Sequence, residues 1–192
     1  MVGAMAKNAK LMDTDSLVVS ARRDAQALGR LYEFYYQRVY RFCLYRLFCK
    51  EAAEDTTSIV FLTVARQIRT FQGRTEQDFA NWLYTIAVNH ANSYIRKSSR
   101  RQRLMDEAAA SIARIQASAD DPPQPDWPTL YSAVSKLKPK HQTIITLRFF
   151  ENMEFEQIAT IVKSKPSTVR VMLHRALRQL KDRLQAVLDG GA

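Results

Sequence analysis

The residues best suited to chemistry in this chain are short hydroxyl and long basic side chains near its C-terminal end. These side chains begin in a tight turn at 163–166 and continue with helical spacing. They are Lys165, Ser167, Thr168, Arg170, Val171, His174, Arg175 and Arg178. Side chains of these types at a helix N-terminus reach base edges and phosphates in the major groove of DNA. The pattern therefore predicts recognition of duplex DNA. The alternative is a solvated basic face on an ordinary helical hairpin.

A second group lies in residues 79–105, which contain no acidic side chain. Aromatic rings can stack on unpaired bases for about 1–3 kcal/mol each, while Lys and Arg pair with phosphates. The stretch is therefore predicted to capture melted DNA through these residues: Phe79, Tyr84, Asn89, His90, Asn92, Ser93, Arg96, Lys97, Arg100 and Arg101. Trp82 and Tyr94 lie on the apolar stripe of the same segment, so we expect both in the core. The alternative for residues 96–103 is a solvated helix end.

The remaining reactive side chains do not form a catalytic pattern. The three histidines are far apart in the sequence and have no Cys or carboxylate cluster at ligand spacing, so no metal site is predicted. Cys43 falls on an apolar stripe and Cys49 near a helix end, which favours structural thiols over nucleophiles. Neither GxGxxG nor a P-loop occurs. We expect no enzyme activity and no cofactor.

The composition agrees with a helical nucleic-acid-binding protein. The chain has 192 residues, a net charge of +10 and 46% hydrophobic residues. It has no apolar stretch of the roughly 18–20 residues that span a bilayer, and its N-terminus has no signal-peptide core. Two cysteines without a CxxC pair fit a reducing compartment. We expect a cytoplasmic protein without a membrane partner, whose partners are polyanions.

The charge is divided into two basic blocks. Residues 28–103 and 128–188 each carry +7, and the segment between them carries −4 and ends in DDPPQP. Proline density blocks regular helix at that end, so we predict an acidic linker that is helical at first and then extended. No period-two alternation occurs, and the predicted fold is all-α with two small helical domains. The predicted divisions are a partly disordered N-terminal segment with a first helix, a first domain, the linker, a second domain and a tail: 1–27, 28–103, 104–127, 128–188 and 189–192.

The local signals for individual helices are clearest in the second domain. Pro139 suits the first turn of a helix. Asn152 can take a left-handed conformation at a break, after which 155–162 reads as a short amphipathic helix. A longer helix begins near Pro166, and the small Ala159 falls where two helices must approach closely. This is a helix-turn-helix. In the first domain, apolar spacing predicts helices around 28–43, 51–71 and from Asp78, with a break at 72–74.

These motifs resemble a known family. Residues 137–180 resemble the promoter-binding fourth domain of bacterial RNA polymerase sigma factors, with Thr168-Val169-Arg170 and Leu173-His174-Arg175-Ala176 as the most specific matches. Residues 31–101 resemble sigma domain two, where Ala53-Glu54-Asp55 and Trp82-Leu83-Tyr84 match. The order of the two domains and the short length are similar to the extracytoplasmic-function (ECF) group of the sigma-70 family.

The resemblance implies partners and roles. The chain would bind the clamp helices of the β′ subunit and the flap of the β subunit of core RNA polymerase, then read promoter DNA. The second domain would read the minus-thirty-five element as duplex, and the first would capture the minus-ten element as melted strand. The linker would thread the polymerase channels that later hold RNA, or act as a passive tether. The resemblance implies polymerase contact by Glu51, Glu54, Asp55, Ser58, Phe61 and Leu62.

Several positions depart from the family pattern. After Asp55 the family usually has an apolar pair, then Gln and an acid, whereas this chain has Thr56-Thr57-Ser58-Ile59. Losing an acid there should weaken binding to a basic surface. Because some relatives are associated with Ser/Thr kinases, we hypothesise that phosphorylation restores the negative charge. The candidate sites are Thr56, Thr57, Ser58 and Thr63.

Other possibilities remain open at this stage. The hydroxyls could cap or pack locally, with the neighbouring acids sufficing for polymerase binding. Ser167, Val171 and Met172 also differ from the usual residues and predict an altered minus-thirty-five preference. An anti-sigma factor is a further candidate partner. The rival interpretation of the whole chain is a polymerase-independent helix-turn-helix regulator, but duplex readers do not need the acid-free aromatic and basic segment.

Overall fold

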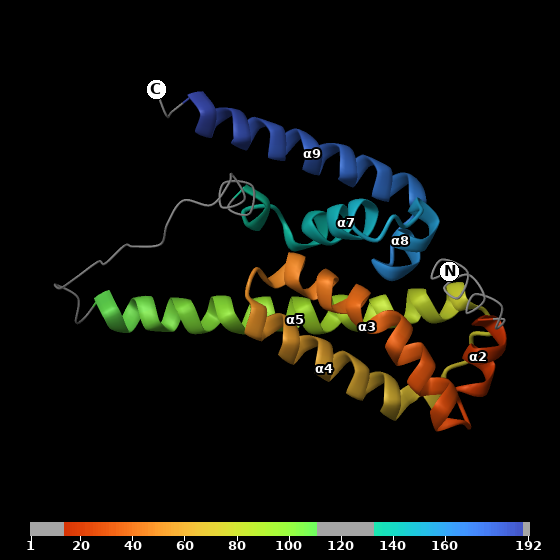
Figure 1. Cartoon of the computed structure of the whole chain (residues 1–192). Coiled ribbons are helices and arrows are strands. Elements are labelled where there is room, and N and C mark those ends of the chain that lie inside the picture. The colour runs from red at the N-terminus through yellow and green to blue at the C-terminus, as the bar shows by residue number, and fades with distance from the viewer. Residues whose placement is uncertain (1–13, 111–132, 190–192) are drawn as a thin grey trace, which may run out of the picture.

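The computed structural model describes residues 14–110 and 133–189, with side chains described for 14–100 and 133–185. Within these ranges every regular element is helical and no strand occurs (Figure 1). The predicted all-α fold is therefore confirmed. The N-terminal residues 1–13, the proline-rich part of the predicted linker and the tail 190–192 lie outside the described residues.

The first unit, residues 14–110, is built from α2 (Thr14–Ser20), α3 (Ala25–Leu47), α4 (Lys50–Gln67), the 3₁₀ helix η2 (Ile68–Thr70) and α5 (Glu76–Ala110). The Asp24 side chain caps α3 by accepting a hydrogen bond from the Gln26 backbone N–H at 2.8 Å. Successive turns of α3 bury Leu31, Tyr35 and Val39 against α4 and α5. The predicted break at 72–74 separates η2 from α5.

The second unit, residues 133–189, contains α7 (Pro139–Phe149), α8 (Phe155–Ile161) and α9 (Pro166–Asp189). Proline stands at the start of α7, as predicted. Asn152 has φ of 51°, which confirms the left-handed break. Glu154 and Gln157 form a capping box at the start of α8. Ala159 is buried where α8 packs on α9.

Helix α5 crosses the predicted boundary between the first domain and the linker. α5 continues to Ala110, so residues 104–110, which the prediction placed at the helical start of the linker, extend this helix. Three alanines at 108–110 and the good helix formers Leu104, Met105 and Glu107 favour this continuation. Helix α5 therefore carries its basic segment along a rigid rod.

The two units pack against each other. Helix α7 contacts α3, and α8 contacts α5, so the second unit covers one side of the first. Figure 1 shows α7 and α8 between the first unit and α9, which lies on the outer side. Residues far apart in the sequence therefore form a continuous apolar core that includes Phe42 and Leu83 of the first unit and Ile144 of the second.

Candidate nucleic-acid interface

Helix α9 presents the predicted duplex-reading side chains on one side. At about 100° per residue, positions 167 to 178 of the predicted set fall within about half of the helix circumference. Their opposites, Val169, Leu173 and Ala176, are buried against α7 and α8. Within the predicted set Thr168 is half-buried, and the exposed members are Lys165, Ser167, Arg170, Val171, His174, Arg175 and Arg178.

Arg170 has a second role inside the unit. Its guanidinium lies 5.0 Å from the Phe155 ring centroid and 3.4 Å from a Glu156 carboxylate oxygen, so it ties α9 to α8. Both charged side chains are well exposed, so the ion pair itself contributes little stability. Arg175 and Arg178 make no such described contact with α8 and present their charge to solvent. These two arginines are therefore the stronger candidates for phosphate contact.

Helix α5 holds a second basic face. Asn89, Arg96, Lys97 and Arg100 are exposed, while Arg101 lies in the part of the helix whose side chains are not described. His90, Asn92 and Ser93 are half-buried. The Asn92 amide oxygen accepts a hydrogen bond from the Arg46 guanidinium at 2.9 Å, and the His90 ring contacts the Thr63 hydroxyl at 3.1 Å.

Two predictions for this face are wrong in this structure. Phe79 and Tyr84 are both buried, so neither ring has a free face for a base. Phe79 packs on Tyr35, and the Tyr84 ring packs edge-on against Phe42 with centroids 5.6 Å apart. Burial raises the Tyr84 pKa, because the phenolate would lose its hydration. Both residues stabilise the core.

The two aromatic residues that were expected in the core differ in their burial. Trp82 is half-buried and stacks on Phe71, with ring centroids 4.6 Å apart, as a core-flanking residue should. Tyr94 is exposed, contrary to the expectation, and lies on α5 two residues before Arg96. Tyr94 is therefore an accessible aromatic on the basic part of α5, and it replaces Phe79 and Tyr84 as the stacking candidate.

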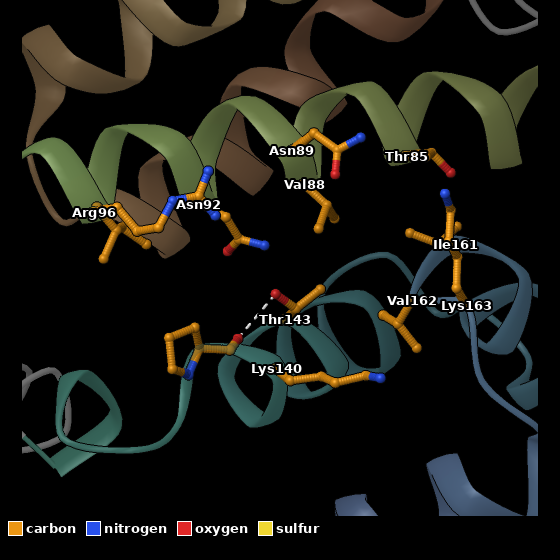
Figure 2. Close-up of a pocket in the computed structure, with 12 residues that line it drawn as sticks. Thr85, Val88, Asn89, Asn92, Arg96, Lys140, Thr143, Ile161, Val162 and Lys163 are labelled. Atoms are coloured by element: carbon orange, nitrogen blue, oxygen red, sulfur yellow. Dashed lines mark hydrogen bonds between the residues drawn. The ribbon is translucent and has the colours of Figure 1, made fainter.

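A cleft of about 390 Å³ separates α5 from the second unit. Figure 2 shows Val88 and Asn92 of α5 pointing toward Thr143 of α7 across this cleft. The residues that line the cleft include no carboxylate. The cationic side chains among them come from both units: Arg96, Lys140 and Lys163. Sequence reasoning did not single out Lys140 or Lys163, because their place in the cleft depends on packing between distant segments.

The predicted polymerase-binding surface lies on α4. Glu51, Glu54, Asp55, Ser58 and Leu62 are exposed along one side of this helix. Phe61 is instead buried, with its ring edge-on to Tyr32 at 4.8 Å between centroids, so its predicted direct contact is wrong in this structure. Ile59, which the prediction treated only as a departure, is exposed beside Leu62. Acidic and apolar side chains therefore share this surface.

The phosphorylation candidates are not equally accessible. Thr56 and Thr57 are buried, and the Thr57 hydroxyl donates a hydrogen bond to the Ala53 carbonyl at 2.7 Å. Thr63 is half-buried between the Ile59 carbonyl and His90. The structure therefore contradicts Thr56 and Thr57 as accessible sites. Ser58 is exposed.

The described ranges contain His, Cys, Asp and Glu side chains, the types that could bind a metal ion. No group of three or more His, Cys, Asp or Glu side chains could hold a metal ion there. Cys43 is buried, and burial raises the pKa of its thiol to about 11. None of the helices described combines the length and apolarity needed to cross a membrane.

The helix-turn-helix and the two basic faces define a DNA-binding protein of two helical units. Comparisons identify its family: residues 31–101 match the model for sigma-70 region 2, and residues 129–180 match sigma-70 region 4. The chain belongs to the sigma-70 family of RNA polymerase sigma factors, in the ECF group. The family is one of transcription initiation factors.

Similar proteins support this assignment. The chain is 34% identical to the ECF sigma factor BldN of Streptomyces coelicolor over 82% of its own length and 60% of that protein. It is 30% identical to sigma factor YlaC of Bacillus subtilis, over 79% of this chain and 88% of YlaC. The sigma factor RpoE of Bartonella quintana, solved with the anti-sigma factor NepR, shares the fold, with a TM-score of 0.63 and 20% identity. That match covers 82% of this chain and 96% of RpoE.

Proposed function

We propose that this chain binds core RNA polymerase and directs it to a specific set of promoters. The second unit reads the minus-thirty-five element as duplex through α9, and the first unit captures the minus-ten element as melted strand along α5. The observation that carries the proposal is the pair of basic faces on separate helical units, one on a helix-turn-helix and one beside an exposed aromatic. The clamp helices and flap are the proposed polymerase contacts.

The two faces suit different forms of DNA. Helix α9 is amphipathic, with its apolar side held by α7 and α8, so its free side can enter a major groove. The α5 face combines Asn89, Tyr94, Arg96, Lys97 and Arg100. Base stacking on the aromatic ring and phosphate pairing with the basic side chains are the two contacts by which proteins hold single strand.

Transcription in vitro tests the proposal. Purified core polymerase from the source organism is given fragmented genomic DNA of that organism, with and without the chain, and RNA 5′ ends are mapped. The expected result is a discrete set of new start sites that share upstream sequence. Duplex binding without new start sites would favour the polymerase-independent regulator instead.

Phosphorylation, if it acts on α4, acts at Ser58. This hydroxyl is exposed between the carboxylates and the apolar side chains of the proposed polymerase surface. A phosphate there adds nearly two negative charges to a face that meets basic helices. Ser/Thr kinases and anti-sigma factors are the proposed regulatory partners.

Ser58→Asp is expected to tighten binding to core polymerase about tenfold, the effect of one charge-assisted hydrogen bond. Fluorescence anisotropy of labelled chain with core polymerase measures this. Ser16→Asp adds the same charge at an exposed position of α2 and is expected to leave affinity unchanged. Thr57→Asp is expected to lower the melting temperature, since it buries a carboxylate. Equal affinity of the Ser58→Asp variant and the wild type for core polymerase would rule out activation by phosphorylation at Ser58.

A further inference from the structure

The cleft between α5 and the second unit gathers positive charge that no carboxylate in its lining balances. Arg96 comes from α5, Lys140 from the first turn of α7, and Lys163 from the turn between α8 and α9. Among the described residues, none of these three side chains belongs to an ion pair. Like charges around one cavity repel each other, so an anion that enters the cleft relieves this repulsion and is favoured there.

The size and the lining of the cleft suit a small organic molecule. Its volume of about 390 Å³ lies within the range of about 300–1,000 Å³ that is usual for ligand pockets. Both walls carry apolar side chains, with Val88 and Ile95 on α5 and Ile161 and Val162 on the second unit. Ligand pockets commonly combine such an apolar lining with a few placed polar groups.

The polar side chains of α5 share one face of this helix. Asn89, Asn92 and Arg96 follow one another at spacings of three and four residues. The Asn92 amide oxygen accepts the hydrogen bond from Arg46 at 2.9 Å, which settles which end of the amide is the acceptor. The Asn92 side chain points toward α7 across the cleft (Figure 2). Its amide nitrogen is therefore a positioned donor for a ligand in the cleft.

The first turn of α7 borders the cleft with the positive end of the helix. Pro139 and Lys140 line the cleft, and the N-cap residue Lys138 makes no side-chain capping hydrogen bond to this 11-residue helix. A helix N-terminus of this kind offers backbone N–H groups and a positive partial charge to an anion. The Lys140 ammonium donates a hydrogen bond to the Ser164 hydroxyl at 2.9 Å, which holds it beside the turn that carries Lys163.

Lys163 has a backbone conformation that favours glycine. Its φ is 50°, in the left-handed region where the Cβ atom is crowded by the backbone. The turn is held in place by a hydrogen bond from the Ser164 N–H to the Ala159 carbonyl at 2.9 Å. Strained residues of this kind gather at ligand clamps. The lysine places a cation on the cleft at a cost in backbone strain that glycine would avoid.

We propose that this cleft binds a small phosphorylated organic molecule of nucleotide size. Its phosphate groups pair with Arg96, Lys140 and Lys163, because a guanidinium holds phosphate oxygens through two hydrogen bonds and ammonium groups add point charges. Its organic part lies against the apolar side chains and accepts a hydrogen bond from Asn92. The site rests on the geometry and charge of the cleft and does not depend on the proposed function.

Calorimetric titration of the full chain with ADP, pyrophosphate and adenosine tests the proposal. Pyrophosphate carries the phosphate part of ADP alone, and adenosine carries the organic part alone. ADP is expected to bind at one site per chain and at least about tenfold more tightly than pyrophosphate, which lacks contact with the apolar side chains. Adenosine is expected to show no binding at the same concentrations, because it lacks the charge.

Two variants assign the binding to the cleft. Lys140→Gln and Lys163→Gly are each expected to weaken ADP binding about tenfold, the loss of one charge-assisted contact. Lys163→Gly is also expected to melt no lower than the wild type, because glycine adopts this φ without strain. Lys136→Gln and Lys181→Gln remove a charge from exposed positions outside the cleft, and both are expected to leave ADP affinity unchanged.

Several results would overturn the proposal. They are no binding of ADP, unchanged ADP affinity in both cleft variants, or an equal loss in the Lys136→Gln control. Equal affinity for ADP and pyrophosphate would overturn the organic part of the ligand. Single-stranded DNA is the other source of phosphate, and anisotropy with a short thymidine oligonucleotide measures its binding. If the cleft variants weaken oligonucleotide binding but not ADP binding, the cleft belongs to the strand-capturing face instead.

Discussion

The double variant Arg175→Glu, Arg178→Glu is expected to abolish nearly all promoter-directed transcription by this chain. Both side chains are exposed on the free side of α9 and lack the ion pair that occupies Arg170. A lost base or phosphate contact costs about 1–3 kcal/mol, so two together give a loss of about 30-fold or more. Charge reversal adds repulsion from the phosphates. Transcription in vitro from a promoter found by the start-site experiment measures the loss.

Salt dependence adds a second check on this variant. Two fewer phosphate contacts should reduce the slope of log affinity against log salt by about 2. The control is Lys181→Glu with Arg183→Glu, which makes the same charge change about one and a half turns farther along α9. The control should lose much less activity. An equal loss in both double variants would assign the effect to net charge rather than to this part of the helix.

The second large effect is expected on α4. Ile59 and Leu62 are 48% and 50% exposed beside the carboxylates of the same helix. Large apolar side chains exposed together in this way mark an interface, and truncating its central anchors costs about 2 kcal/mol or more. Ile59→Ala with Leu62→Ala should therefore weaken core-polymerase binding about 30-fold or more, without loss of folding.

The matched control for α4 is Val19→Ala. Val19 is a 46% exposed apolar residue on α2, outside the proposed polymerase surface. Anisotropy titrations of the variants should separate the two positions, with Val19→Ala indistinguishable from wild type. Unchanged affinity of the α4 variant would place the polymerase contact on another surface.

Most helices of this fold could be predicted because their signals are local. Apolar spacing, Pro139 at a helix start and Asn152 at a helix break all act within a few residues, and the structure confirms each. The face of α9 also followed from spacing, since a two-helix scaffold dictates which side is buried. Residues 104–110 were placed in the linker by their charge and were expected to be helical at first, and α5 continues through them to Ala110.

The errors on α5 and α4 arise from packing on more than one side. Phe79 has the spacing of a core residue with Leu83 and Ile86, a signal that was present in the sequence. Tyr84 is different, because it is covered by α3 on one side and by Glu151 of the second unit on another. No local pattern encodes a contact between segments 67 residues apart. The burial of Arg46 has the same origin.

The exposed outer side of α9 affects where chains that are not bound to polymerase are located. A basic helix that stays exposed while α5 is partly covered can still bind the phosphates of any duplex. Chains that are not bound to polymerase would then be held along the chromosome at non-promoter sites. The pool available to polymerase would depend on ionic strength and on the amount of accessible DNA, as well as on the number of molecules synthesised.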